Sequence, residues 1–328
     1  MDLDFLFGLQ SWREAIGGSL DNFFLFISLI AVDYFLMVPA LIIFWNFDKR
    51  KACNMLCSYG TSIFCGAFLK ATFSVYRPWV RDPRIKPVQG ALGAATGYSF
   101  PSGHVSSTAG FYGGVIAAFK KYWWVVVFSA LMVALTMFSR LYLGVHTPQD
   151  VLIALLVGAA STAIIALLLN LADKYKNADI FIYVGAAVLV IGLLLYISLK
   201  SYPIDYDDLG KIIVDPKKMT VDGFKDPGVF FGIMTGWFIE RRFIKFDNNG
   251  TTGQKVARAV IGGFLYVLWE TVLVGPLGKL IGVGVVHFFL KMSTPLIFMT
   301  LYPLIFKKIE SKGFLAKKEQ EYNSCVNK

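Results

Sequence analysis

Two residues suited to nucleophilic chemistry, His146 and Asp150, stand four positions apart near the middle of the chain. The intervening Thr147-Pro148 is typical of the N-cap and first position of a helix, which places Asp150 about one turn inside it. At that spacing a carboxylate can hydrogen-bond one imidazole nitrogen and leave the other free as a nucleophile. The pattern predicts a reactive histidine, with a structural histidine beside a carboxylate as the alternative.

A second polar block, Pro101-Ser102-Gly103-His104, opens an apolar segment of the chain. Ser102 is placed to cap the helix expected there, and the free N–H groups and positive dipole end of a helix start can bind an anion. Gly103 lets the backbone approach a phosphate closely. An ordinary helix cap beside an interfacial histidine would have the same sequence. The block is therefore a candidate phosphate cradle.

Three cations accompany these blocks, Lys70, Arg77 and Arg140. Lys70 and Arg77 are seven residues apart, so on one helix they would share a face and lie about 10 Å apart along its axis. Isolated cations near helix ends usually extend toward lipid headgroups instead. Together with the two histidines, these three cations could neutralise a transferring phosphoryl group without a metal.

The segments that carry these blocks have the composition of a membrane protein. Of the 328 residues 56% are hydrophobic and 16% charged, against roughly 25% charged in a soluble domain. The apolar residues form long blocks, which predicts an all-α, polytopic membrane bundle. The net charge of +10 arises from basic residues in the short gaps between blocks, which is not the single basic face of a nucleic-acid-binding protein. Membrane lipids are thus the expected partners, and nucleic acid is not.

About nine transmembrane helices are expected, because each span needs about 20 apolar residues. Residues 4–16 are expected to form a short interfacial helix before them. The seventh span is short, and the eighth is interrupted near Gly275-Pro276. The expected spans are 22–45, 53–76, 102–119, 122–142, 148–172, 179–199, 227–244, 256–275 and 284–306.

Basic residues cluster in alternate gaps, and such clusters stay in the cytoplasm. Threading nine spans then places the N-terminus outside and a basic tail, 307–328, in the cytoplasm. The segment 201–226 lies outside as a solvated connector, or alternatively as a lid. The segment 77–101 also lies outside, and its cations need a reason other than topology: Arg77, Arg81, Arg84 and Lys86. The three polar blocks meet at the outer ends of spans two to five.

Disulfides, metals and cofactors are not expected. No cysteine falls in a predicted exported loop, and three histidines without a closely spaced cysteine pair do not form a zinc site. The start of the chain lacks the pattern of a cleaved signal peptide, so the first apolar block is expected to remain as a helix. The cysteines are Cys53, Cys57, Cys65 and Cys325.

In order, the three blocks read Lys, six residues, Arg-Pro; Pro-Ser-Gly-His; and Ser-Arg, five residues, His, three residues, Asp. This pattern resembles, without departure, the signature of the type 2 phosphatidic acid phosphatase family, which shares its active site with vanadium haloperoxidases. The resemblance implies that His146 attacks phosphorus to form a phosphohistidine, that Asp150 orients it, and that His104 protonates the leaving oxygen. The phosphate-binding residues that it implies are Lys70, Arg77, Ser102, Gly103 and Arg140.

The expected function is metal-independent hydrolysis of a lipid phosphate or diphosphate at the outer face of a bacterial plasma membrane. Undecaprenyl diphosphate, phosphatidic acid and phosphatidylglycerophosphate are candidate substrates. Residues 1–200 form the expected phosphatase core of about six spans, and 227–306 form three further spans without a recognised motif. A lipid phosphotransferase using the same site is one alternative. A noncatalytic lipid transporter with a polar pathway is another, its ionisable residues being Asp33, Glu270 and His287.

Overall fold

The computed structural model describes residues 2–207, 210 and 212–311, and within them the chain is a bundle of α-helices with three π-helical turns. The predicted all-α class is confirmed. The expected tail beyond residue 311, with Cys325, lies outside the described residues. The elements are α1 (Asp2–Ala15), α2 (Asp21–Ile30), α3 (Asp33–Asn46), α4 (Lys49–Phe73), α5 (Pro78–Arg81), α6 (Gln89–Leu92), α7 (Gly103–Phe119), α8 (Trp123–Tyr142), α9 (Pro148–Lys174), α10 (Ala178–Leu199), α11 (Pro216–Gly223), α12 (Lys225–Ile239), η1 (Glu240–Ile244), α13 (Thr252–Leu268), η2 (Trp269–Val274), α14 (Gly275–Leu280), α15 (Gly284–Leu296) and η3 (Ile297–Leu301).

All nine predicted apolar segments are helical, and the chain is an integral membrane protein. By length and composition, six helices of the described chain can cross a membrane, or seven if the pair α2 and α3, bent by 40°, is one span. The helix α7 has 17 residues and α12 has 15, so both are shorter than a typical span. The number nine is therefore approximate.

Two of the predicted spans differ in detail from the observed helices. The first is broken at Val32, whose backbone is extended, a conformation that β-branched residues favour. The eighth is not interrupted near Pro276, because the helix runs from Thr252 to Leu280. The π-helical turn η2 directly precedes the proline, which is the second residue of α14, and a π-helical turn is one of the ways in which a helix accommodates local disruption of its hydrogen bonds.

Small residues on α7 allow it to lie directly against α4. A Cβ atom added at Gly110 would be 2.7 Å from the carbonyl oxygen of Ser58, and one at Gly114 would be 2.6 Å from the Cα atom of Met55. Close approach of backbones through small residues is a common way to pack membrane helices. This contact fixes the start of α7, and hence the second polar block, relative to Lys70 at the end of α4.

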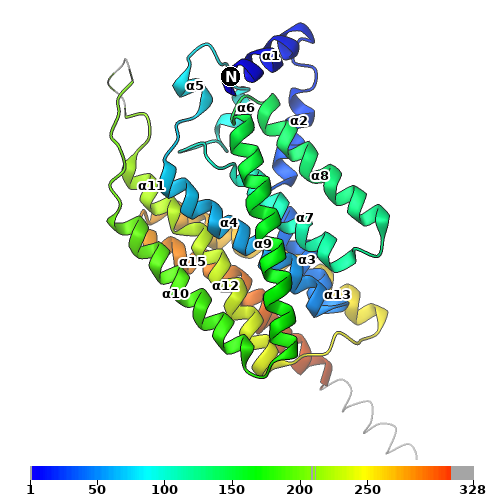
Figure 1. Ribbon diagram of the computed structural model, residues 1–328. Coiled ribbons are helices and arrows are strands. Elements are labelled where there is room, and N and C mark those ends of the chain that lie inside the picture. Colours follow the sequence, from blue (N-terminus) through cyan, green and yellow to red (C-terminus); the bar gives the residue numbers. More distant parts are fainter. Residues whose placement is uncertain (1, 208–209, 211, 312–328) are drawn as a thin grey trace, which may run out of the picture.

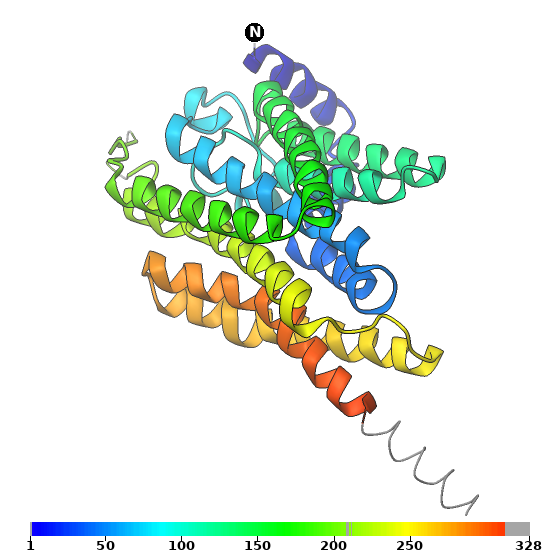
Figure 2. The same ribbon diagram turned by 60° about the horizontal axis from the view of Figure 1, so that its bottom comes forward.

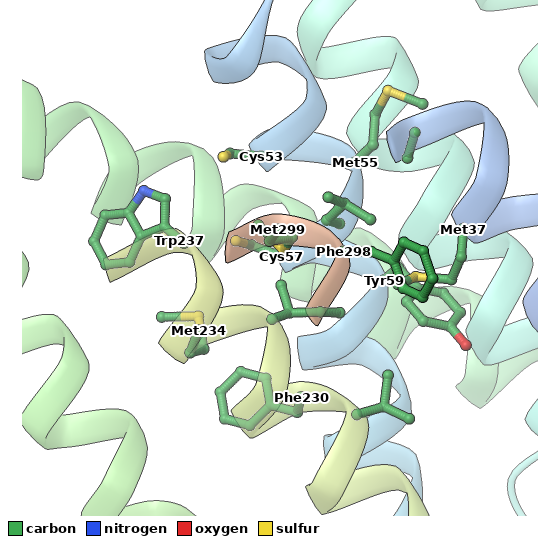
Figure 3. Close-up of a cluster of buried hydrophobic side chains, with 14 of the residues drawn as sticks. Met37, Cys53, Met55, Cys57, Tyr59, Phe230, Met234, Trp237, Phe298 and Met299 are labelled. Carbon is green, nitrogen blue, oxygen red and sulfur yellow. The ribbon is translucent and has the colours of Figure 1, made fainter. Parts of the chain in front are cut away.

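The three C-terminal spans are part of the same bundle, and α12 packs against both α4 and α15. Three glycines four residues apart on α12 face α15 and η3, and a Cβ atom at the middle one, Gly232, would be 2.6 Å from the ring of Pro295 on α15. Figure 3 shows the core that results, where Cys57 of α4 meets Met234 of α12 and Met299 of η3. Cys57 is a buried free thiol here.

Basic residues gather where α9 ends and α10 begins, and this end of the bundle lies opposite α1 (Figure 1). Arg50 and Arg241 both bond the carboxylate of Asp173, each at 2.7 Å, and Arg242 pairs with Asp179 at 2.6 Å. The connections before α4, after α9 and after η1 therefore meet at one end. The described chain begins at one end of the bundle and finishes at the other, as an odd number of passages requires (Figures 1 and 2). Which end faces the cytoplasm stays a prediction.

Candidate active site

The imidazole of His146 is held at the start of α9 by a capping box. Thr147 is the N-cap residue, its hydroxyl accepts from the N–H of Asp150, and the Asp150 carboxylate accepts from the N–H of Thr147 at 2.8 Å. The predicted cap is thus confirmed. It locks Asp150 in place, with its Oδ2 atom 3.4 Å from Nδ1 of His146. Figure 1 shows this end of α9 beside the segment 74–102, which carries other residues of the site.

The other ring nitrogen of His146 faces Arg77. The Nη1 atom of Arg77 lies 2.9 Å from Nε2 of His146, and a guanidinium can only donate hydrogen bonds. Nε2 must therefore be the acceptor, so it carries a lone pair and the ring proton resides on Nδ1. This is the tautomer in which Nε2 can attack an electrophile.

The electrostatics of the site favour this neutral ring. His146 lies between the membrane-spanning helices α8 and α9, and it is buried. Burial, and then the charge of Arg77, hold the pKa of His146 well below its ordinary value of 6.5, although Asp150 acts in the opposite direction. The physical reason is that both a dry environment and a nearby cation disfavour a second positive charge.

The position of Arg77 corrects one prediction. Arg77 does not share a helix face with Lys70, because α4 ends at Phe73 and Ser74 adopts a left-handed backbone conformation. Arg77 is instead the N-cap residue of α5, immediately before Pro78, and a residue before proline disfavours the helical conformation. Its guanidinium donates to the carbonyl oxygens of Thr96, Gly97 and Val145, which orient it toward His146.

Ser99 is part of the site and was missed by sequence reasoning. Its hydroxyl donates to Oδ2 of Asp150 at 2.6 Å and lies 3.3 Å from Nδ1 of His146. With its proton directed to the carboxylate, the oxygen can accept from the ring. The local sequence, a serine between a tyrosine and a phenylalanine, does not indicate a role in the site. Only the folding of the segment 82–102 brings Ser99 to His146 and Asp150.

Ser102 and Gly103 occupy the start of α7 as predicted, but the expected side-chain cap does not form. Ser102 is the N-cap residue, its side chain makes no capping bond, and its backbone N–H donates to the carbonyl oxygen of Asp150. Within the described residues its buried hydroxyl has no hydrogen-bond partner. A Cβ atom at Gly103 would have no described atom within 4 Å. The helix start is therefore open on the Gly103 side.

Arg140 is fully buried near the end of α8. Its Nη1 atom donates to the hydroxyl of Ser28 on α2, another contact that sequence reasoning missed. Its Nε and Nη2 atoms have no partner among the residues that the structure describes. Buried donors are nearly always satisfied in folded proteins, so a guanidinium with two unpartnered donor nitrogens is expected to hold an anion.

Lys70 and His104 line a cavity of about 120 Å³ between α4 and α7. Lys70 donates to the carbonyl oxygen of Tyr98 at 3.3 Å. His104 lies close enough to four other site residues for their charges to affect it, namely Arg140, His146, Arg77 and Lys70. All eight predicted site residues therefore belong to one region of the bundle, although they come from the ends of five helices, α4, α5, α7, α8 and α9.

Other polar residues singled out from the sequence lie elsewhere or have local partners. Glu270 is buried, and its carboxylate bonds Lys291 at 2.8 Å and the hydroxyl of Thr294 at 2.6 Å. His287 is buried on α15. Of the cations in the segment 77–101, Arg77 reaches the site, whereas Arg84 pairs with Asp82 at 2.7 Å. The side chain of Asp33 lies outside the described part of the chain.

Comparisons with known proteins match two stretches of the chain to one superfamily. Residues 51–174 match the PAP2 superfamily, and residues 224–317 match the transmembrane extension of PAP2 superfamily phosphatases. The second match identifies the last three spans, for which no motif was recognised in the sequence. The chain is 26% identical over 157 residues to an undecaprenyl-diphosphatase of Sulfolobus acidocaldarius, covering 47% of this chain and 72% of that protein. No solved structure matches it significantly. The chain belongs to the PAP2 superfamily and is a membrane phosphatase.

Proposed function

We propose that the chain hydrolyses a lipid phosphate or diphosphate through a phosphohistidine on His146, without a metal ion. The observation that carries this proposal is the orientation of the His146 ring. Nε2 accepts from Arg77 and is directed away from Asp150, while Nδ1 faces Asp150 and Ser99. An imidazole oriented in this way by a carboxylate is an activated nucleophile.

In the first step the Arg77 donor turns from Nε2 of His146 to a phosphoryl oxygen, the freed lone pair on Nε2 attacks phosphorus, and the bond from phosphorus to the leaving oxygen breaks. His104 begins protonated and gives its proton to that oxygen, so that an alcohol or a lipid phosphate leaves. In the second step His104 takes a proton from water, the water oxygen bonds to phosphorus, and the P–N bond breaks. Inorganic phosphate leaves, and both histidines return to their starting states.

The phosphoryl oxygens would be held by Arg140, Arg77 and Lys70, with the Ser102 hydroxyl and the Gly103 N–H completing the cradle. Support comes from the donors that the described protein leaves unsatisfied, the Nε and Nη2 atoms of Arg140, and from the unpartnered hydroxyl of Ser102. Positioning and charge neutralisation are most of what phosphoryl transfer requires. Such donors are strongest in a dry, preorganised site.

A lipid is the substrate class that suits a site at the end of a transmembrane bundle. The matching undecaprenyl-diphosphatase supports a polyprenyl diphosphate as one candidate, beside phosphatidic acid and phosphatidylglycerophosphate. We place the site on the extracytoplasmic face, because the basic connections gather at the opposite end and basic residues resist translocation.

The test is release of inorganic phosphate by the detergent-purified protein from a panel of lipid phosphates and diphosphates in EDTA. His146→Ala is expected to abolish release, and His287→Ala, a buried histidine of α15, serves as the matched control. Activity that EDTA removes would refute metal independence. Phosphate transfer that requires a second lipid acceptor would indicate a phosphotransferase, and lipid movement that survives His146→Ala without release would indicate a transporter.

The covalent intermediate can be tested separately. The protein is incubated with substrate labelled in the phosphoryl group, and the reaction is stopped with alkali. Acid is avoided because a phosphohistidine is labile to acid and stable to alkali. Label bound to the protein is expected in the unsubstituted chain, more of it in His104→Ala if leaving-group departure still occurs, and none in His146→Ala. Label that persists in His146→Ala would contradict the assigned nucleophile.

A further inference from the structure

The C-terminal extension contributes a carboxylate to the cavity beside the site. Asp226, in the first turn of α12, lines the same cavity as Lys70 and His104. Its negative charge is close enough to the Lys70 ammonium to attract it electrostatically. The residue lies within the matched extension and outside the match to the phosphatase domain. A carboxylate beside a predicted phosphate site is unexpected, because it repels the substrate's own charge.

The packing of α12 holds this carboxylate in place. The helix approaches α4 closely one turn beyond Asp226, where a Cβ atom at Gly60 would be 3.4 Å from the Cα atom of Phe230. On the other side, a Cβ atom at Gly228 would be 3.1 Å from the backbone carbon of Phe288 on α15. With α4 and α15 both in backbone contact, the start of α12 has little freedom to move away from the cavity.

The stereochemistry of the proposed reaction indicates which part of the substrate the cavity receives. In an in-line displacement the nucleophile and the leaving oxygen occupy opposite faces of phosphorus. His104, the proposed acid for the leaving oxygen, lines the cavity, and within the described chain His146 is not among the residues that line it. Because Lys70 and Gly103 line the cavity too, it would receive the phosphate together with the leaving oxygen, and Asp226 would lie beside the leaving group.

The volume of the cavity limits what it can receive. About 120 Å³ corresponds to roughly four water molecules at about 30 Å³ each. Because Lys70 and Gly103 line it as well, this space would receive the phosphate and the atoms next to the ester, and it is too small for the lipid chains. A carboxylate there can distinguish leaving groups by the polar substituent next to the ester.

We propose that Asp226 selects a leaving alcohol that carries a hydrogen-bond donor, an ammonium or a hydroxyl group, on the carbon next to the phosphate-bearing carbon. The proposal rests on the proposed phosphatase function and specifies its substrate class. Phosphate monoesters of amino alcohols and of polyols would be accepted. A polyprenyl diphosphate would be disfavoured, because its leaving group is itself an anionic phosphate that faces the carboxylate.

The experiment compares Asp226→Asn with the unsubstituted protein on three probes: sphingosine 1-phosphate, which has an ammonium next to the ester carbon, farnesyl monophosphate, which has no donor, and farnesyl diphosphate. The ratio of kcat/KM for sphingosine 1-phosphate to that for farnesyl monophosphate is expected to fall about 10- to 150-fold in the variant, the range for a hydrogen bond to a charged group. The ratio for farnesyl diphosphate to farnesyl monophosphate is expected to rise. Lysophosphatidic acid against phosphatidic acid tests the hydroxyl donor in the same way.

Two matched variants complete the design. Asp222→Asn removes a carboxylate one turn earlier that pairs with Lys225, and it should leave both ratios unchanged. Asp226→Glu keeps the charge, so it should retain the preference for the donor. This variant keeps the proposal testable if Asp226→Asn folds poorly. Equal loss for all three probes in Asp226→Asn would overturn the proposal, because it would mean that Asp226 only positions Lys70.

Binding measured without turnover separates this inference from the proposed function. In the His146→Ala background, sphingosine 1-phosphate should bind more tightly than farnesyl monophosphate, and adding Asp226→Asn should remove the difference. A difference in binding with no hydrolysis by any chain would refute the phosphatase function and keep the selectivity. Equal binding of the two probes with intact hydrolysis would refute the selectivity alone.

Discussion

Ser99→Ala is the substitution that most directly tests how His146 is oriented. The serine hydroxyl makes a short hydrogen bond of 2.6 Å to the Asp150 carboxylate and lies 3.3 Å from Nδ1 of His146. Alanine removes this link and changes neither the nucleophile nor any phosphate donor. Asp150 keeps its 2.8 Å bond from the N–H of Thr147, so the capping box of α9 survives.

A hydrogen bond to a charged group contributes roughly 1.5–3 kcal/mol, and each 1.36 kcal/mol of barrier corresponds to about a tenfold change in rate. Ser99→Ala is therefore expected to lower kcat about 10- to 150-fold. KM should change much less, because Arg140, Arg77 and Lys70 are untouched. Loss of His146 itself should be more severe, because no other group replaces the nucleophile.

The assay is initial-rate release of phosphate over a range of substrate concentrations. Ser129→Ala is the matched control, because Ser129 is equally buried on α8 and its hydroxyl has no partner within the described chain. Unchanged kcat in Ser99→Ala would refute the positioning role. A rise in KM with constant kcat would also refute it, since that result would place Ser99 in substrate binding.

Further predictions concern protonation, the phosphate cradle and the extension. Because burial and Arg77 depress the pKa of His146, the acid limb of a bell-shaped kcat/KM profile should lie below pH 6.5, and a flat profile from about pH 5 to 8 would contradict the two-histidine mechanism. The same shift means that unfolded chains bind a proton that folded ones do not as pH falls below 6.5, so acidification should lower the thermal unfolding midpoint. Gly103→Ala should leave that midpoint unchanged, because no described atom lies within 4 Å of its Cβ position, yet lower kcat/KM by at least tenfold if phosphate contacts the backbone there; full activity would exclude that contact. Gly232→Leu should cost about 1–3 kcal/mol or more, because its side chain would overlap Pro295, whereas Gly185→Leu, with no described atom within 4 Å, should not shift the midpoint. Equal midpoints for the two leucine variants would contradict the close packing of α12 on α15.

Features of the site that depend on local chain geometry were predictable from the sequence. The capping pattern Thr147-Pro148 places His146 and Asp150 one helical turn apart whatever the rest of the fold, and the apolar blocks specify the helices. Arg77 was misplaced because a seven-residue spacing was extended across a helix end. The proline that follows Arg77 was the available signal for that end.

Contacts between distant segments were not predictable in this way. Ser28 meets Arg140 across 112 positions of the chain, and Ser99 meets Asp150 across 51. Both are single serines without a surrounding pattern, and only the packing of helices brings them together. Asp226 is a similar case, because the approach of α12 to α4 depends on glycines whose partners lie on other helices.

The late position of α12 in the chain has a consequence for biosynthesis. The ribosome completes α4, α7 and the start of α9, with both histidines, before the segment that carries Asp226 is translated. A nascent chain that has inserted only as far as α10 thus holds the proposed nucleophile and acid while one wall of the cavity is still missing. On the proposed role of Asp226, chemical competence precedes substrate discrimination during synthesis, and discrimination begins when the last helices enter the membrane.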